Sequence, residues 1–233
     1  MADEFLDNLL DRQQKPLRPP RRGFRIRTWQ VILLIVALAG IAGAVYYLLV
    51  PLDAPIPDDA GQLVAGLEQA TTTEGYPRLG NPDAPILIED FSSYACPHCA
   101  DFHEEIFPDL VDKIAAGQVQ FVFIPVSHIG SGAGDAAQAA LCAGEQGRFW
   151  TMHDVLFSWN KPSVGSLYGE RRLKKGAENL GLDTDAFAAC LDGDRDVLEA
   201  ARREFTLRGL QGTPAFFING QRVRDYDEFE DLG

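Results

Sequence analysis

The chain has 233 residues, of which 46% are hydrophobic and 24% charged, a composition that is ordinary for globular proteins and excludes a wholly disordered chain. The net charge of −13 is unevenly spread, because residues 1–28 carry +3, residues 29–50 carry no charge and residues 51–233 therefore carry −16. So acidic a body repels phosphate backbones, and we expect no nucleic-acid partner.

The N-terminal part predicts a single transmembrane helix over residues 29–50. Val31–Val50 is a run of 20 residues without a charge, which matches the ~30 Å hydrocarbon core of a bilayer. Trp29 lies at one end of the run and Tyr46 near the other, as interfacial aromatic residues do. The run lacks the polar stripe of a buried core helix, so we expect it to contact lipid through residues 29–50.

Charge sets the expected orientation of this helix. Basic residues crowd residues 1–28 and acidic residues follow Val50, so the positive-inside rule places residues 1–28 in the cytoplasm as a tail and the rest of the chain outside. A cleaved signal peptide is the alternative. The long leader before the run, and a run longer than the ~7–15 residues of a signal peptide, favour an uncleaved anchor.

Residues 51–75 are expected to be a linker, with prolines at positions 51, 55 and 57 and a short helix over Gly61–Ala70. A globular domain is expected over residues 76–233. It begins with a buried strand at Pro85–Phe91. An amphipathic helix follows, since apolar residues recur at every fourth position; they are Phe102, Ile106, Leu110 and Ile114.

A second strand is expected at Gln118–Val126, which completes a βαβ unit with two parallel strands. Residues 133–208 read as almost wholly helical. Thr213–Asn219 reads as a strand, and Asn219-Gly220 is a two-residue hairpin signal before a return strand. The predicted fold is α/β, with a helical insertion at about 133–208 between the βαβ unit and a C-terminal ββ hairpin.

The strongest chemical signal is Cys96-Pro97-His98-Cys99, a C-x-x-C motif between a strand and a helix. Pro97 suits the first helical position, which places the Cys96 sulfur at the unsatisfied N–H groups of the helix. That environment lowers the pKa of the Cys96 thiol, and His98 adds a positive charge or a hydrogen bond. Cys99 lies one turn further on, where we expect a more buried, resolving thiol.

Two cysteines at this spacing are also half of a zinc site, and His103 follows four residues after Cys99. A copper- or zinc-binding assembly factor that uses Cys96, Cys99 and His103 is therefore an alternative to redox chemistry. The chain has no second C-x-x-C pair to complete a four-ligand site, so we expect redox chemistry and no metal or cofactor.

The segments EDFSSYACPHCADFH and GTPAFFING, about 110 residues apart with a helical block between them, resemble the DsbA-like thiol-disulfide oxidoreductases of the bacterial envelope. The likeness covers about residues 76–223 and implies a thioredoxin-like fold. It also implies a cis peptide bond at Thr213-Pro214 beside the active-site disulfide, where a trans proline opening a strand is the alternative. Asp90, six residues before Cys96, matches a buried acid of thioredoxin-like proteins that takes the proton of Cys99.

The resemblance implies a function outside the cytoplasm, on a bacterial cell membrane. We expect a dithiol oxidase that introduces disulfides into unfolded or reduced exported proteins, and a quinone-linked membrane partner of the DsbB or VKOR type that reoxidises it. A reductase or isomerase with the same residues is the alternative. Phe91 and Tyr94 flank the motif and would shape a hydrophobic substrate surface.

Cys142 and Cys190 lie in the helical block, and an even number of cysteines outside the cytoplasm fits two bridges. Related members carry a structural bridge in this block, which implies a Cys142–Cys190 disulfide. Two reduced core thiols, or a second redox pair that relays to Cys96, are the alternatives. The family also has a longer C-terminal helix than Asp225–Leu232, which is short and acidic here.

Overall fold

The computed structural model describes residues 28–49, 53–160, 167–230 and 232. The predicted cytoplasmic tail, residues 1–28, therefore lies outside the described residues except for Thr28. The chain divides into two compact units at Pro51/Leu52, and each is described by itself.

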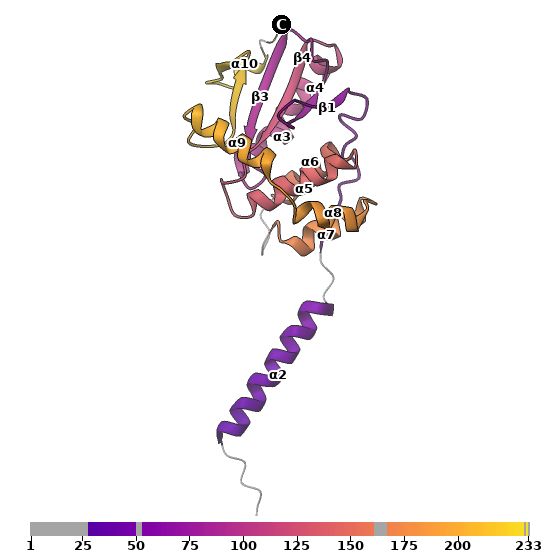
Figure 1. The fold of residues 1–233 in the computed structure, drawn as a ribbon, viewed down its shortest axis with the longest axis vertical. Helices are drawn as coiled ribbons and strands as arrows, with labels where there is room; N and C mark the ends of the chain where they lie inside the picture. The colour runs from indigo at the N-terminus through magenta and orange to yellow at the C-terminus, as the bar shows by residue number, and fades with distance from the viewer. Residues whose placement is uncertain (1–27, 50–52, 161–166, 231, 233) are drawn as a thin grey trace, which may run out of the picture. The chain divides into compact units, whose positions relative to one another are not determined.

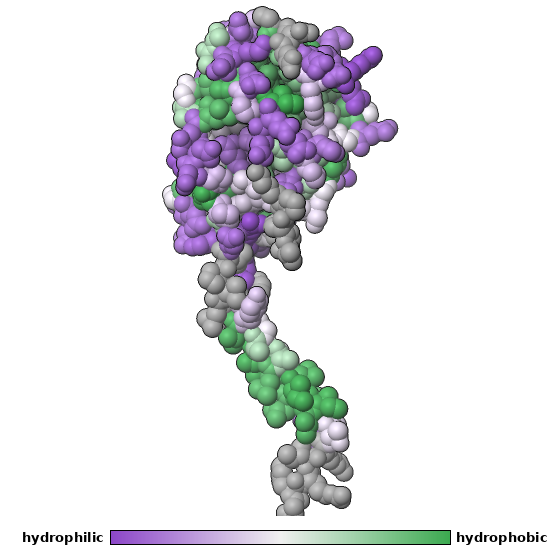
Figure 2. All heavy atoms as spheres, turned by 180° about the vertical axis from the view of Figure 1, so that it is seen from behind, coloured by the Kyte–Doolittle hydropathy of each residue, from purple (hydrophilic) through white to green (hydrophobic). Residues whose placement is uncertain are grey.

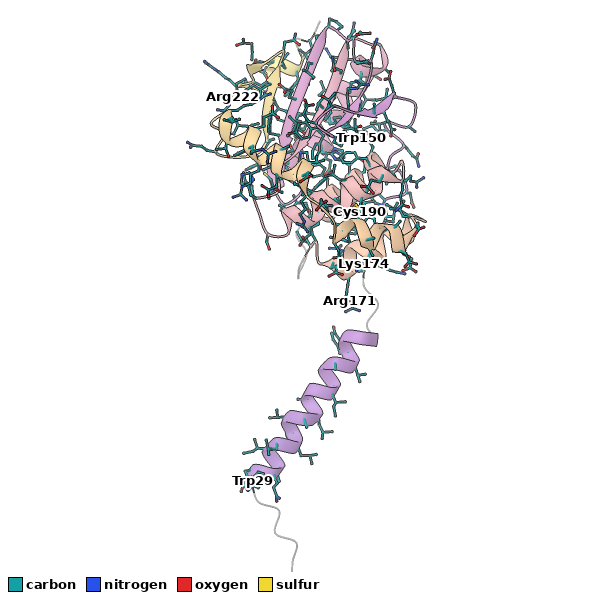
Figure 3. All side chains as sticks on the ribbon, viewed as in Figure 1. Trp29, Trp150, Arg171, Lys174, Cys190 and Arg222 are labelled. Atoms are coloured by element: carbon teal, nitrogen blue, oxygen red, sulfur yellow. A yellow bond between two sulfur atoms is a disulfide. The ribbon has the colours of Figure 1, made fainter. Side chains whose placement is uncertain are left out.

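The first unit contains helix α2, Thr28–Leu49. Its residues 28–46 are long and apolar enough to cross a membrane, with a mean hydropathy of 2.2. The side chains of residues 28–46 are exposed, and Figure 2 shows this helix as a mostly hydrophobic surface. Trp29 lies at the N-terminal end of this helix (Figure 3). The predicted helix over residues 29–50 thus differs from the observed one by a single residue at each end.

The second unit is built on a six-stranded sheet with the order β1-β2-β4-β3-β5-β6. Strands β3 and β4 are parallel, as the βαβ pattern predicts, and the other neighbouring pairs are antiparallel. The strands are β1 Gln69–Thr71, β2 Pro77–Leu79, β3 Ile86–Ser92, β4 Val119–Pro125, β5 Ala215–Ile218 and β6 Gln221–Arg222. Figure 1 shows β3 and β4 side by side in the middle of the domain.

The central strand β3 presents successive side chains to opposite faces of the sheet. Ile88 belongs to the larger hydrophobic cluster, with Phe102 and Leu110 from the helices that follow the cysteine motif. Phe91 belongs to a second cluster on the other face, with Phe205 of the last helix before β5. Burial on both faces explains why this strand reads as a mostly apolar run rather than as an alternating one.

The predicted helix after the cysteine motif is two helices, α3 Pro97–Glu105 and α4 Phe107–Ala115. Pro108 causes the break, because proline has no N–H to donate to the carbonyl four residues earlier and its ring clashes there. The residue between the helices, Ile106, has φ −113°. The apolar residues still face one side, so the predicted stripe holds across the break.

Residues 133–208 are helical as predicted, except that residues 161–166 lie outside the described part. The helices are α5 Ala133–Glu145, α6 Phe149–Trp159, α7 Glu170–Asn179, α8 Thr184–Leu191 and α9 Asp196–Leu207. Figure 1 shows α5, α7 and α8 grouped at one end of the sheet, whereas α9 lies beside its strands. The thioredoxin-like α/β fold with a helical insertion is confirmed.

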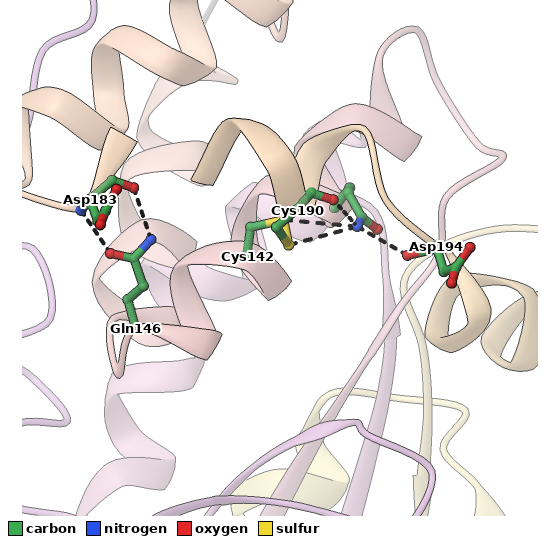
Figure 4. The surroundings of a disulfide bond; sticks show 6 residues. Cys142, Gln146, Asp183, Cys190 and Asp194 are labelled. Carbon is green, nitrogen blue, oxygen red and sulfur yellow. Dashed lines mark hydrogen bonds between the residues drawn. A yellow bond between two sulfur atoms is a disulfide. The ribbon is translucent and has the colours of Figure 1, made fainter. Parts of the chain in front are cut away.

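A disulfide joins two helices of the insertion. Cys142 of α5 and Cys190 of α8 are bonded, with Cα atoms 5.7 Å apart and a sequence separation of 48 (Figure 4). The side-chain amide of Gln138 donates to the carbonyl oxygens of Cys190 and Asp194, at 3.0 and 3.3 Å. The bridge and this amide together tie α8 and the following loop to α5.

The expected linker, residues 51–75, is not a free spacer from residue 53 onward. Ala54 is buried, and its carbonyl oxygen accepts from Asn179 Nδ2 at 2.9 Å. The indole N–H of Trp159 donates to the Pro55 carbonyl at 2.8 Å. The expected helix over Gly61–Ala70 is a series of turns that leads into β1, so the segment is part of the domain. The sequence of this segment does not predict its packing, because its apolar residues are isolated between prolines and show no helix or strand period.

The C-terminal hairpin forms as predicted. Asn219 and Gly220 have φ values of 50° and 77°, the left-handed pair that a tight hairpin turn requires. The acidic end of the chain forms a short helix, α10 Asp227–Glu230, in which Phe229 is buried against the ring of Phe216. This segment therefore packs on the domain despite its acidity.

Candidate active site

The cysteine motif lies where β3 passes into α3. Cys96 is the N-cap residue of α3, with extended backbone angles, and Pro97 occupies the first helical position, as the sequence predicts. The backbone turns between strand and helix through a hydrogen bond from Cys96 N to Ser93 O. Both Cys96 and Cys99 are free thiols in this structure, which therefore represents the dithiol state.

The environment of the Cys96 sulfur stabilises a thiolate. The pKa of Cys96 is lowered to about 5, chiefly by a hydrogen bond from the Cys99 thiol, against which burial acts. The Thr213 side chain and the backbone N–H groups of Cys99 and His98 add to the lowering. These amides are the unsatisfied donors of a helix N-terminus, so the predicted mechanism of activation is present in the geometry.

Cys99 is the opposite case. It is 1% exposed, and burial raises the pKa of its thiol far above the ordinary value, with the neighbouring Cys96 and Asp90 acting in the same direction. The backbone N–H of Ser93 lies 3.4 Å from its sulfur. Two thiols three residues apart thus differ strongly in acidity.

Asp90 lies beneath this pair on β3 and is 3% exposed. Burial raises the pKa of its carboxyl to about 8, partly offset by a hydrogen bond from the Ser92 hydroxyl and assisted by the charge of Cys96. The structure therefore brings Asp90 into electrostatic contact with both cysteines. Glu89, its neighbour, faces the other side of the sheet and forms an ion pair with Arg208 at 2.6 Å.

The segment before β5 completes the site. The Thr213–Pro214 peptide bond is cis. The Cys96 thiol donates to the Thr213 carbonyl oxygen, with a sulfur–oxygen distance of 3.2 Å. The Thr213 side-chain oxygen is buried, and it has no hydrogen-bond partner among the described residues while Cys96 is a thiol that donates to the Thr213 carbonyl. When Cys96 is a thiolate, the Thr213 hydroxyl can donate to its sulfur, and in this way it lowers the pKa of Cys96.

The two histidines of the sequence hypotheses have different surroundings. The His98 side chain is 81% exposed, and its Nδ1 lies 3.5 Å from the surface carboxylate of Asp101. The backbone N–H of His98, in contrast, is hydrogen-bonded to the Cys96 sulfur and lowers the pKa of Cys96. His103 Nε2 lies 3.0 Å from Asp154 Oδ1. In the described ranges, no three His, Cys, Asp or Glu side chains are grouped to hold a metal ion, so Cys96, Cys99 and His103 are not brought together as ligands.

Several residues that hold the active-site loop carry no sequence signal. Asn160 Nδ2 donates to the Cys96 carbonyl at 2.8 Å, and the Tyr168 hydroxyl donates to the Tyr94 carbonyl at 2.5 Å. Gly130 has φ +93°, and a Cβ there would lie 2.5 Å from the Cβ of Ala95. Asn160 and Tyr168 join the helical insertion to the active-site loop, and Gly130 lets the loop after β4 approach it closely, over sequence separations that no local pattern reveals.

The predicted substrate surface at Phe91 and Tyr94 is wrong. Both side chains are fully buried, Phe91 in the cluster under α9 and Tyr94 against the ring of Phe123. The Tyr94 hydroxyl is hydrogen-bonded to His153 Nδ1 at 2.9 Å. Phe91 and Tyr94 thus support the active-site loop from inside, because this loop is packed between the sheet and the helical insertion.

The arrangement is suited to thiol-disulfide exchange. One sulfur is acidic and lies at the end of a helix beside the cis bond, a second is buried and basic, and a carboxyl group with a pKa near neutrality lies next to both. A low-pKa sulfur is a good leaving group, and a disulfide that contains it is readily attacked.

Comparison with known proteins agrees with this chemistry. Residues 72–233 match a family model described as thioredoxin. The chain is 28% identical over 175 residues to the disulfide bond formation protein D of Bacillus subtilis, covering 68% of this chain and 74% of that protein. It is 32% identical over 157 residues to a protein-disulfide oxidoreductase, named as putative, of Rickettsia bellii, of which the match spans 58%.

The fold is also similar to solved structures. The crystal structure of oxidised BdbD from Bacillus subtilis superposes with a TM-score of 0.61 at 25% identity, covering 70% of this chain and 91% of that one. A thioredoxin-like oxidoreductase from Silicibacter pomeroyi superposes with a TM-score of 0.57 at 25% identity, covering 76% and 95%.

Proposed function

Since the chain belongs to the thioredoxin family and is a DsbA-like thiol-disulfide oxidoreductase, we propose that it acts as a dithiol oxidase that introduces disulfides into unfolded exported proteins. One observation carries the proposal: the pKa of Cys96 is lowered to about 5 while that of Cys99 is strongly raised. Stabilising the thiolate stabilises the reduced enzyme, and this makes its disulfide a stronger oxidant.

The exchange proceeds in two steps. A substrate thiolate attacks the Cys96 sulfur of the oxidised enzyme, which forms a mixed disulfide, breaks the Cys96–Cys99 bond and releases the Cys99 thiolate. A second substrate thiolate then attacks the substrate sulfur of the mixed disulfide. Cys96 departs as a stable thiolate, the substrate gains a disulfide, and the two electrons remain on the Cys96/Cys99 pair.

Asp90 moves the proton that Cys99 needs. The Cys99 thiolate is strongly basic in its buried site, whereas Asp90, with a pKa of about 8, is mostly protonated at neutral pH. Asp90 therefore gives Cys99 a proton as it leaves, and takes that proton back when Cys99 attacks during reoxidation. Thr213 and Pro214 hold the segment beside which the substrate backbone lies.

The enzyme works outside the cytoplasm, anchored by α2. Supporting this are the length and hydropathy of the helix, the basic residues that precede it and the disulfide between Cys142 and Cys190, which is typical of oxidising compartments. Reoxidation passes the two electrons to a membrane acceptor, a quinone-linked protein of the DsbB or VKOR type. An anchored domain meets such an acceptor at the same membrane surface.

The reduction potential of the Cys96/Cys99 couple tests the direction. The purified protein is equilibrated with glutathione buffers, with Cys99→Ser as the variant that cannot form the bond. A dithiol oxidase is expected to have a value of about −120 mV, whereas a value of about −270 mV identifies a reductase and contradicts the proposal. Transfer of disulfides to a reduced, unfolded protein is measured in parallel.

A further inference from the structure

The buried cysteine and Asp90 are shielded on one side by four aromatic rings. Phe102 follows Cys99 by three residues on α3, and Phe216 is the strand neighbour of Asp90 on β5. Their ring centroids are 4.2 Å apart. The rings of Tyr226 and Phe229 pack outside this inner pair, with centroids 5.9 and 5.5 Å from that of Phe102.

Tyr226 is the ring at the boundary with solvent. Phe102, Phe216 and Phe229 are buried, whereas Tyr226 is 41% exposed. Tyr226 also lines a cavity of about 440 Å³ whose wall includes Asp109 of α4. Burial raises the pKa of the Tyr226 phenol, and the charges of Cys99 and Asp90 raise it further, so the ring lies within electrostatic reach of both.

The segment that carries this ring is held in place. Glu228 Oε1 accepts hydrogen bonds from the backbone N–H groups of Arg224 and Asp225, at 2.7 and 3.2 Å. Lys113 of α4 donates to the carbonyl oxygen of Leu232. Arg224 and Asp225 on one side of α10 and Leu232 on the other are thus each held by a hydrogen bond, although α10 itself is very short.

We propose that Tyr226 is a positioning residue whose ring keeps water from Asp90 and Cys99. The inference rests on the proposed role of Asp90 as proton donor and deepens it. The aromatic ring, rather than the hydroxyl, supplies the effect, because it completes the wall of Phe102 and Phe216.

Truncating the ring admits water from the cavity toward the carboxyl group. Water stabilises a carboxylate, so the pKa of Asp90 falls toward the ordinary value for aspartate. The titratable groups that face Asp90 are Cys96 and Cys99 from α3, Tyr94 from the loop after β3 and Tyr226 itself. A lower pKa leaves Asp90 mostly ionised at neutral pH, without the proton that Cys99 requires.

The experiment compares Tyr226→Ala with Tyr226→Phe in the full-length dithiol protein. The pKa of Asp90 is followed by carboxyl carbon NMR, with Asp90→Asn identifying the signal. Leu207→Ala, which shortens a largely exposed apolar side chain on α9, controls for loss of surface hydrophobicity. Far-ultraviolet circular dichroism checks folding. If Tyr226→Ala does not fold, Tyr226→Gln, which removes the ring but keeps a side chain of similar length, replaces it with the same expected fall in the pKa of Asp90.

Tyr226→Ala is expected to lower the pKa of Asp90 by at least one unit, and Tyr226→Phe and Leu207→Ala to leave it unchanged. In the same variant, the pH at which disulfide transfer loses half its rate shifts down by the same amount. An unchanged Asp90 pKa in Tyr226→Ala, or an equal fall in Tyr226→Phe, overturns the inference. The NMR measurement needs no exchange activity, so this failure is distinct from a failure of the proposed oxidase function.

Discussion

The Cys96 sulfur lies 3.2 Å from the carbonyl oxygen of Thr213, 117 positions later in the chain. The residue before the cis proline therefore touches the sulfur that exchanges. Since the Thr213 hydroxyl has no other partner in the described dithiol structure, its contribution can be removed without breaking another hydrogen bond.

Replacing Thr213 by valine is expected to raise the pKa of Cys96 by about one unit, because a hydrogen bond to a charged group contributes about 1.5–3 kcal/mol and one pKa unit corresponds to about 1.4 kcal/mol. Thiolate absorbance at 240 nm, followed against pH, measures the change. Thr206→Val, which removes a hydroxyl bonded to Arg202 O on α9, is the matched control. An unaltered titration in Thr213→Val would show that the hydroxyl does not act on the sulfur.

The raised pKa of Asp90 carries a cost in stability. Between about pH 4, where an unfolded aspartate ionises, and pH 8, where the native one does, only the native state holds the proton. The contribution of Asp90 to the free energy of unfolding therefore falls as the pH rises from about 4 to about 8. Asp90→Asn is expected to raise the free energy of unfolding at pH 8 by roughly 3–5 kcal/mol, and to have little effect at pH 4. Denaturant titrations at both pH values measure the free energy of unfolding, and the surface variant Asp112→Asn is the control. An equal effect of Asp90→Asn at the two pH values would contradict the account.

The same variant tests the proton transfer. Without an acid beside Cys99, release of the resolving thiolate is expected to slow by about 10²-fold, the usual contribution of a positioned acid or base. Stopped-flow kinetics with a thiol peptide and the oxidised enzyme resolve this step. If Asp90→Asn reacts at the rate of the unmodified protein, another group supplies the proton.

The bridge between α5 and α8 is expected to stabilise the fold without joining the chemistry. Replacing both Cys142 and Cys190 by alanine opens a loop with a sequence separation of 48. This is expected to lower the free energy of unfolding by about 4 kcal/mol on the chain-entropy model. The pKa of Cys96 and the rate of disulfide transfer should remain unchanged. A double variant that is stable but fails in repeated turnover would instead identify a relay.

The parts of the fold that were predictable are those set by local patterns. The apolar run of β3, the hairpin signal at Asn219-Gly220 and the proline after Cys96 each specify a backbone conformation that the structure contains. The strands β1 and β2 were missed, because three residues are too few to show a period. Their place in the sheet depends on pairing with β4.

The site was predictable to the same degree. The placement of Cys96 at a helix end follows from the motif itself, and the family resemblance pointed to Asp90 and to Thr213-Pro214. Asn160 and Tyr168 could not have been found, since each acts by one hydrogen bond across more than 60 residues of sequence. The buried state of Tyr94 likewise arises from packing against the insertion, which no neighbouring residue encodes.

The acidity of one sulfur is the measurement on which the account depends most directly. Thiolate absorbance at 240 nm of the dithiol protein is titrated from pH 3 to pH 10, with Cys96→Ser and Cys99→Ser assigning the transitions. The account predicts a transition for Cys96 near pH 5, which is absent in Cys96→Ser, and no ionisation of Cys99 in this range. A first thiol transition at the ordinary value, about pH 8.5, would contradict it.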